Sequence, residues 1–284
     1  METQHLPLHK QLCRKDANDY PAVTGGDERI GEIIQESSLA LDTFQVLDGR
    51  RKVRTDGYKP SLTAIDFALG TDWSGLAAGW LLEWERRTPG WEEARSRLNN
   101  TVLGIAKLKF GFVTGAAIYN PTTGVLTPPL DDPDNKGLVG ISHLSSVFGL
   151  PEVISDLVDH WGASIPKGFE DAWYDYAYYY GASAEEQTAK YGKAFGRVSL
   201  RQGHSRLTAY IANKYDNETL ATRTWNEFLA TDGFKPDSPW SSVHLSGSEV
   251  LVEVDEAAWI STNDAALYGT SAIENLALAR NGLK

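Results

Sequence analysis

A short break, Thr88-Pro89-Gly90, separates two helical segments and constrains the fold more than any other feature of the sequence. The segment from Asp72 to Arg87 is apolar on nearly all sides until its last turn, so we expect a helix that neighbours bury on most of its surface. The segment from Trp91 carries one apolar stripe, formed by Ala94, Leu98, Val102 and Ile105. Because proline and glycine end the first helix and the connection is short, the second helix can run back beside the first. The sequence therefore predicts an antiparallel helix hairpin.

The second half of the chain repeats this pattern. Apolar residues recur at helical spacing in four further segments, 153–161, 169–180, 199–214 and 217–230, and a last apolar helix is expected over 256–280. Ser183 and Glu186 have the spacing of a capping box at the start of a polar helix over 184–195. Residues 250–254 are the one segment that looks like a strand. About ten helices, mostly paired in hairpins, predict an all-α fold.

Segments rich in Gly, Pro, Asp and Asn separate these helices. We expect an irregular lead-in over 1–27, a polar loop that ends at about residue 70, and long loops over 110–140 and 231–255. Hairpins whose alternate helices are apolar on two faces suit an α/α toroid, in which inner helices pack inside an outer ring. A superhelical array would show a fixed sequence period, and none is visible. We therefore predict a single α/α-toroid domain over 1–284, complete or incomplete, with at most short β segments.

Charge narrows the range of partners. The chain has 38 acidic and 27 basic residues and no basic run, which argues against nucleic acid or an anionic membrane surface as a partner. A few converging Arg or Lys residues can still bind an acidic sugar, so such a site has to be local. No segment is long and apolar enough to span a bilayer, and the first residues do not resemble a signal peptide. The single cysteine, Cys13, excludes an intrachain disulfide and leaves the compartment open.

The expected helix over 199–214 places a histidine among aliphatic residues. The stripe that should turn away from water consists of Leu200, His204, Leu207 and Ile211. The polar band beside this stripe consists of Arg201, Ser205 and Thr208. Such a helix can line a cavity, with Gly203 leaving space beside the imidazole. The alternative is a core histidine whose ring nitrogens bind neighbouring polar groups.

Several short motifs, spread over nearly the whole chain, resemble one known family. They are Pro7-Leu8-His9-Lys10-Gln11, Thr24-Gly25-Gly26-Asp27-Glu28-Arg29, Gly70-Thr71-Asp72-Trp73, Gly111-Phe112-Val113-Thr114-Gly115, Ser142-His143-Leu144-Ser145, Leu200-Arg201-Gln202-Gly203-His204-Ser205-Arg206 and Ser261-Thr262-Asn263-Asp264. Together these motifs resemble the C-terminal α/α-toroid domain of the exo-rhamnogalacturonan lyase and YetA-like family. Its members are usually longer and often carry an export signal. In this family β-rich domains precede the toroid. The resemblance thus implies such an upstream domain, missing from this sequence, as a further partner.

The resemblance also implies β-elimination at a uronic acid of pectic rhamnogalacturonan. Removal of the C5 proton needs a base, donors or a cation that neutralise the carboxylate, and an acid for the departing O4. Histidine and tyrosine suit the base and the acid, and the guanidinium fork of arginine matches a carboxylate. A calcium ion with oxygen ligands could share that role, and no other cofactor is expected. The spacings typical of zinc proteases, phosphate-binding loops and serine nucleophiles do not occur.

The candidate residues follow from the quoted motifs and from the last helix. The predicted catalytic residues are His204, His143 and Tyr268, with base and acid left open. The predicted substrate-binding residues are Arg201, Arg206, Arg29, His9, Lys10, Asp72, Trp73, Asn263 and Asp264. Each also has a structural alternative: Asp72 can cap a helix, Arg29 can pair with a neighbouring carboxylate, and most of the nine tryptophans have to be core residues. No set of metal ligands is predicted.

Two other functions stay open at this point. A glycoside hydrolase on the same fold would need two carboxylates that flank the scissile bond, and Asp72 and Asp264 form the obvious pair. A non-catalytic carbohydrate-binding domain, or a degenerate fragment of a larger enzyme, would need no catalytic group at all.

Overall fold

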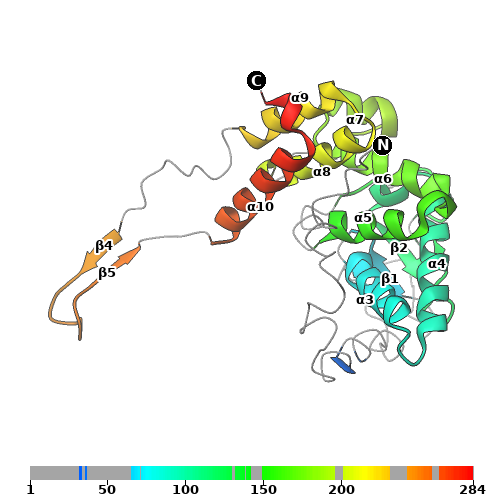
Figure 1. The fold of residues 1–284 in the computed structure, drawn as a ribbon, viewed down its shortest axis with the longest axis horizontal. Coiled ribbons are helices and arrows are strands. Elements are labelled where there is room, and N and C mark those ends of the chain that lie inside the picture. The colour runs from blue at the N-terminus through cyan, green and yellow to red at the C-terminus, as the bar shows by residue number, and fades with distance from the viewer. Residues whose placement is uncertain are drawn as a thin grey trace, which may run out of the picture. The chain divides into compact units, whose positions relative to one another are not determined.

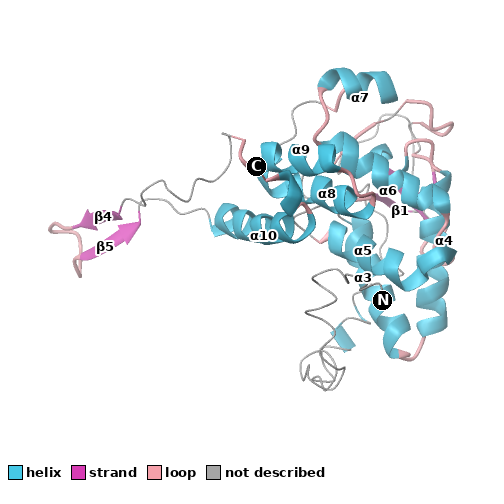
Figure 2. Ribbon diagram, turned by 45° about the horizontal axis from the view of Figure 1, so that its top comes forward, coloured by secondary structure: helices cyan, strands magenta, loops and turns pink. Residues whose placement is uncertain are grey.

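The computed structural model describes residues 32, 33, 36, 65–70, 72–129, 132–137, 139–141, 149–195, 201–230, 242–257 and 262–283. These residues are mostly helical with a few short strands, which confirms the all-α prediction (Figures 1 and 2). The chain divides into two compact units, residues 1–198 and residues 199–284, and each is described by itself. That the two form one domain stays a prediction. None of the described helices is long and apolar enough to cross a membrane.

Helix hairpins build the first unit. Its helices are α3 (Asp72–Arg86), α4 (Trp91–Lys107), α5 (Leu150–Trp161), α6 (Lys167–Tyr180) and α7 (Ala184–Tyr191), with short 3₁₀ turns η1 (Gly111–Thr114) and η2 (Gly162–Ser164). Helices α3 and α4 pack together, α6 packs on α4, and α5 packs on α3. Gly90 adopts the left-handed conformation with φ 90° at the turn into α4, which explains why glycine ends the break. The predicted first hairpin is confirmed.

An aromatic cluster forms the core of the first unit. The ring centroids of Trp73 and Phe112 are 5.4 Å apart, and those of Phe112 and Phe169 are 5.5 Å apart, both edge-on. Gly111 has φ 48°, and a Cβ at this position would overlap with the side chain of Ala172 on α6. Turn η1 therefore lies directly against α6.

A small antiparallel sheet accompanies these helices. Its strands β1 (Ile65–Ala68), β2 (Ala116–Tyr119) and β3 (Leu126–Thr127) pair in the order β1-β2-β3, with Ile65 opposite Tyr119. The predicted loop up to about residue 70 is therefore wrong at its end, since it contains β1. A four-residue strand whose partner lies far along the chain has no local periodicity that could reveal it.

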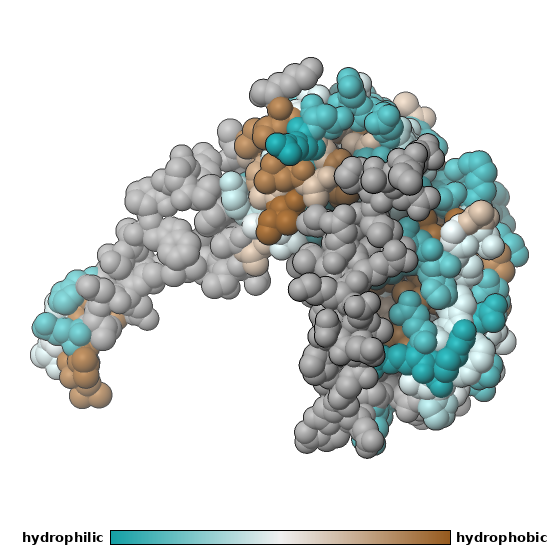
Figure 3. Space-filling view, viewed as in Figure 1, coloured by the Kyte–Doolittle hydropathy of each residue, from teal (hydrophilic) through white to brown (hydrophobic). Residues whose placement is uncertain are grey.

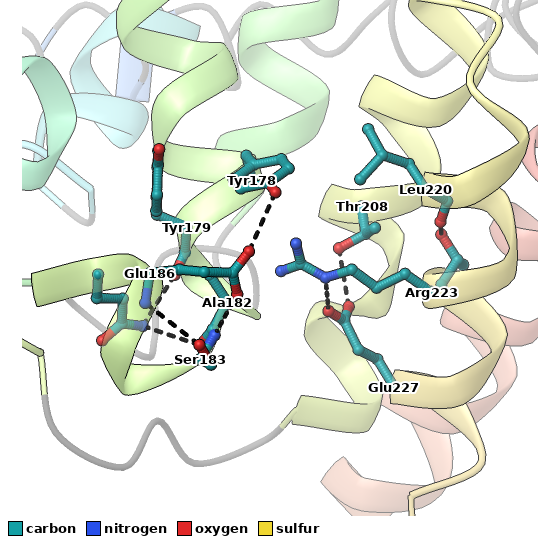
Figure 4. A network of polar contacts seen from close by, with 11 residues as sticks. Tyr178, Tyr179, Ala182, Ser183, Glu186, Thr208, Leu220, Arg223 and Glu227 are labelled. Carbon is teal, nitrogen blue, oxygen red and sulfur yellow. Dashed lines mark hydrogen bonds and ion pairs between the residues drawn. The ribbon is translucent and has the colours of Figure 1, made fainter. Parts of the chain in front are cut away.

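Helix α7 begins as the sequence predicts. Ser183 donates its backbone N–H to Glu186 Oε2 at 2.8 Å, and Glu186 donates its backbone N–H to Ser183 Oγ at 3.2 Å (Figure 4). This reciprocal pair is the predicted capping box. The helix ends at Tyr191 and not at 195, because Gly192 turns left-handed with φ 79°.

Replacing Ser183 by alanine is expected to lower the free energy of unfolding by about 1 kcal/mol, since the Glu186 N–H loses its acceptor. Ser183→Asp keeps an acceptor at this position and should stay close to the parent protein. Urea denaturation of the three proteins, followed by circular dichroism, measures the difference. Equal midpoints for the alanine and aspartate variants would contradict this role of the cap.

The second unit contains α8 (Arg201–Lys214), α9 (Glu218–Phe228), α10 (Thr262–Leu278) and the 3₁₀ turn η3 (Arg280–Gly282). Helices α9 and α10 both pack on α8, and η3 packs on α9. Asn217 caps α9, because its Oδ1 accepts the backbone N–H of Leu220 at 3.0 Å. The predicted helices over 199–214 and 217–230 are therefore confirmed to within a few residues.

A β-hairpin also belongs to this stretch of the chain and corrects three predictions. Strands β4 (Ser242–Leu245) and β5 (Val254–Ala257) pair with His244 opposite Asp255. The predicted loop over 231–255 therefore contains a strand, the predicted strand over 250–254 lies mostly in the turn, and the last helix begins at Thr262 and not at 256. Leu251 and Val252 expose their apolar side chains at the tip of this hairpin (Figure 3). Their β propensity suggested a strand, but the pairing with β4 starts after them.

Candidate functional site

Helix α8 is the central element of the second unit. All its residues from Gln202 to Ala209 are buried. The described members of the predicted stripe (His204, Leu207 and Ile211) and of the polar band (Ser205 and Thr208) are therefore covered. A Cβ on Gly203 would lie 3.3 Å from the side chain of Leu267, so α8 and α10 approach closely at this glycine. A helix buried on so many sides has to satisfy its polar side chains within the protein.

Hydrogen bonds from α10 satisfy part of this polar band. Ser205 Oγ donates to the carbonyl oxygen of Gln202 at 2.7 Å and accepts from Asn275 Nδ2 at 2.9 Å. Ser271 Oγ donates to the carbonyl oxygen of Gly203 at 2.9 Å. These bonds connect the two helices at the positions where their backbones approach.

A buried carboxylate on α9 binds the next polar group of α8. Glu227, which is 6% exposed, accepts the Thr208 hydroxyl at 2.8 Å and the Arg223 Nε–H at 2.7 Å (Figure 4). A charge at this depth is tolerated only when it is paired and hydrogen-bonded. The cluster of Glu227, Thr208 and Arg223 therefore stabilises the contact of α8 with α9.

Glu227→Ala is expected to lower the free energy of unfolding by about 2 kcal/mol, because Thr208 and Arg223 lose their shared acceptor. Asn226→Ala changes an exposed neighbour on the same helix and should have little effect. Guanidinium denaturation of both variants measures the difference. A loss of the same size in both would show that α9, and not this carboxylate, carries the effect.

Three predicted site residues with described side chains lie in this second unit. His204 is 2% exposed and Arg206 is 4% exposed, and Arg206 Nη1 lies 3.2 Å from Glu274 Oε1 on α10. The Tyr268 ring packs on Phe228 with centroids 4.9 Å apart. The structure thus brings His204, Arg206 and Tyr268 into one helical unit. The catalytic and binding roles of these residues stay predictions. The burial of His204 and Arg206 does not favour them, because a buried side chain does not reach a substrate.

Two candidates of the first unit, Asp72 and Trp73, have described side chains, and both make structural contacts. The Asp72 carboxylate accepts the backbone N–H of Ala68 at 2.8 Å and so ties the end of β1 to the start of α3. Trp73 is 0% exposed between Phe112 and Phe169. This burial does not favour contact of Trp73 with a substrate, and its predicted binding role stays a prediction.

The remaining candidates are placed only in part. Arg201 begins α8, and Asn263 and Asp264 lie in the first turn of α10, but the side chains of all three lie outside the description. His9, Lys10, Arg29 and His143 lie outside the described residues altogether. Within the described part of the chain, no group of three or more His, Cys, Asp or Glu residues could hold a metal ion. A role for calcium stays untested.

A surface pocket of the first unit contains residues that the sequence did not single out. Trp91, Arg95 and Asn99 line it from α4, and Trp161 lines it from the end of α5. A signal was present in the sequence, since the three α4 positions recur every four residues and so form one strip along the helix, directly beside the apolar stripe. The tryptophan among these polar residues is the part of the pattern that a purely solvated face does not need.

Burial controls the ionisation of two tyrosines near α7. It raises the pKa of the Tyr180 phenol and that of Tyr191 well above their usual value, and the nearby Asp175 adds to the effect at Tyr191. Tyr191 Oη is buried and has no hydrogen-bond partner among the described residues. Both phenols therefore stay neutral in the folded protein at pH values where an unfolded chain would ionise them.

These shifts predict a loss of stability at high pH. An unfolded tyrosine ionises near pH 10, so the stability that neutral Tyr191 contributes is complete below about pH 10 and falls as the pH rises above it. Tyr191→Phe should leave the midpoint of thermal unfolding at neutral pH nearly unchanged and reduce its fall between about pH 9 and about pH 11.5. Tyr215→Phe, which removes an exposed phenol, is the control. An equal alkaline fall in both variants would contradict the prediction.

The helices of the two units give the architecture. The class of domain comes from comparison with known protein families. A family model, the PcRGLX-like protein C-terminal alpha/alpha toroid domain, matches residues 20–284. The chain therefore belongs to this family, which confirms the predicted α/α toroid and the resemblance found in the motifs. Membership supports a carbohydrate-active domain of the rhamnogalacturonan lyase-like kind.

The chain is also similar to the uncharacterized protein YetA of Bacillus subtilis (strain 168). The two are 26% identical over 269 residues, which are 91% of this chain and 28% of that protein. The similarity supports the fold assignment along most of the chain. It covers too little of the longer protein for the activity of the whole relative to be transferred.

Proposed function

We propose that this chain is the toroid domain of a polysaccharide lyase-like protein that acts on pectic, rhamnogalacturonan-type acidic polysaccharide by β-elimination at a uronic acid. The observation that carries the proposal is the match of the rhamnogalacturonan lyase-like family model to residues 20–284. The acidic net charge of −11 does not oppose it, because a polyanion can be bound by a few local cations.

The residue types that elimination needs occur together in the second unit. Of a histidine and a tyrosine, one can take the C5 proton as the base and the other can give a proton to the departing O4 as the acid. An arginine can neutralise the carboxylate. His204, Tyr268 and Arg206 are the corresponding candidates. Arg206 already pairs with Glu274 at 3.2 Å, so a substrate carboxylate would have to compete with this partner.

Carbohydrate binding without turnover is the second candidate function. The burial of His204 and Arg206 favours it, because a group that reacts with a polymer has to touch it.

One assay separates these functions. The protein is incubated with rhamnogalacturonan, homogalacturonan and a neutral galactan, once with calcium and once with a chelator. Elimination gives a 4,5-unsaturated uronide that absorbs in the ultraviolet, and we expect this product from rhamnogalacturonan only. New reducing ends without this absorbance would mean hydrolysis. Retention on the immobilised polysaccharide without any product would support the binding function and overturn elimination by this chain.

A further inference from the structure

The polar face of α4 forms one wall of a pocket of about 340 Å³. The lining residues are Trp91, Glu92, Arg95, Ser96, Asn99 and Trp161. The five that belong to α4 follow the helical period, so they form one face, while the neighbouring stripe with Leu98 and Ile105 is buried in the core. A pocket of this volume is large enough for a small ligand such as one sugar residue.

Trp84 holds two of the lining side chains in place. Its ring centroid lies 5.3 Å from that of Trp161, and the guanidinium carbon of Arg95 lies 5.0 Å from the Trp84 ring. His160 packs edge-on against the same indole at 4.3 Å. Trp84 itself is buried, so Trp161 and Arg95 are held against a rigid part of the protein.

The second tryptophan of the pocket is also held by a neighbour. The Arg87 guanidinium carbon lies 4.0 Å from the centroid of the Trp91 ring, and the ring remains partly exposed. Two partly exposed indoles thus line a hollow whose other walls are a cation, an amide, a hydroxyl and a carboxylate. Flat apolar rings combined with convergent polar groups are typical of a ligand site and are not needed to solvate a helix.

We propose that this α4–α5 pocket, lined by Trp91, Arg95, Asn99 and Trp161 among others, binds a uronic acid residue of an acidic oligosaccharide. The indole rings can pack against the C–H face of a pyranose, and the Arg95 fork matches its carboxylate. Asn99 and Ser96 can exchange hydrogen bonds with ring hydroxyls, and Glu92 can accept from them. The pocket is independent of His204 and needs no turnover, whereas the choice of a uronic acid rests on the proposed function.

Galacturonate and galactose are the probes that test this site. They share one ring and differ in a carboxylate, and as monosaccharides neither has a 4-linked residue that could be eliminated. The full chain is titrated with each sugar while the indole N–H signals of Trp91 and Trp161, assigned from the variants, are followed by NMR. We expect both signals to shift, with tighter binding of galacturonate.

Arg95→Ala should weaken galacturonate binding about fivefold and leave galactose binding unchanged, since one partly exposed ion pair is lost. Trp161→Ala should weaken binding of both sugars about threefold to tenfold. Trp91→Ala is a second aromatic variant, because Trp161→Ala also removes the ring contact between Trp161 and Trp84. Arg86→Ala and Glu93→Ala, which change exposed residues outside the pocket, should bind like the parent protein.

The outcomes separate this site from the proposed elimination. Shifts at Trp91 and Trp161 that depend on Arg95 support the site even if no unsaturated product ever forms. Elimination of rhamnogalacturonan without any shift of these signals would overturn the site and leave the proposed function standing. Equal binding of both sugars in the parent and in Arg95→Ala would overturn the uronic acid assignment.

Discussion

Replacing Gly282 by alanine is expected to lower the free energy of unfolding of the second unit by about 3 kcal/mol or more. A Cβ at this position would overlap with the carbonyl carbon and oxygen of Ala221 and lie 2.6 Å from the backbone nitrogen of Thr222. These are backbone atoms of α9, which cannot rotate away as the end of a side chain could. Relief therefore requires that η3 move off α9.

Such a movement would break further contacts. Trp225 Nε1 donates to the carbonyl oxygen of Ala279 at 2.7 Å, and Gly282 donates its backbone N–H to the same oxygen at 3.0 Å. The first bond depends on η3 lying against α9, whereas the second lies within the turn itself. Losing a hydrogen bond to a buried indole adds about 1 kcal/mol to the cost of the displaced turn.

Gly269→Ala is the matched control, because no atom lies within 4 Å of the added Cβ and Gly269 lies inside α10. Alanine in a helix interior should stabilise the protein by about 0.5–1 kcal/mol, opposite in sign to the change at Gly282. Urea denaturation of the full chain, followed by tryptophan fluorescence, measures both. A Gly282→Ala protein as stable as the parent would show that η3 does not pack as closely as described.

The helices could be predicted from the sequence because their signals are local. The Thr88-Pro89-Gly90 break, the Ser183 cap and the apolar stripe of α4 each lie within a few residues of the structure they specify. The structure reproduces all three. Even here, the end of α7 was placed too late, because the left-handed turn at Gly192 outweighs the polar helical pattern that follows it.

Strand β1 could not be predicted because its partner is remote. Strand β1 pairs with β2 about fifty positions further along the chain, and a four-residue strand carries too little periodicity to stand out. The chain over 250–261 reads as strand and then helix, but β5 takes up residues that the sequence assigns to the last helix. Tertiary pairing overrides local propensity in both places.

The candidate site shows the same limit at the level of side chains. The sequence correctly predicts a helix around His204. It places Ser205 and Thr208 in a polar band that could line a cavity. The partners that bury them, Asn275 and Glu227, lie on other helices and could not be assigned from spacing. The sequence also does not show which of the nine tryptophans reach a pocket. Trp73 and Trp91 both lie at the start of a helix, but Trp91 lines a pocket whereas Trp73 is buried in the core.

If His204 removes or supplies a proton in the proposed elimination, His204→Gln is expected to lower the rate of formation of the unsaturated product by about 100-fold or more. Glutamine is similar in size to histidine and retains a donor and an acceptor, but it does not titrate near neutral pH. His204→Ala should be equally inactive and also less stable, because it leaves a cavity at a position that is 2% exposed. The control is His244→Ala on β4, whose side chain is exposed.

The two His204 variants distinguish chemistry from packing because they alter these properties separately. A purely structural histidine predicts that activity follows stability, so His204→Gln would keep most of the elimination rate and His204→Ala would lose it together with the fold. A catalytic histidine predicts that both variants are inactive although His204→Gln unfolds at nearly the same denaturant concentration as the parent. Rates measured beside denaturation midpoints decide between the two. Full elimination by a well-folded His204→Gln protein would exclude His204 as the base or acid and leave its imidazole as part of the buried polar contact between α8 and its neighbours.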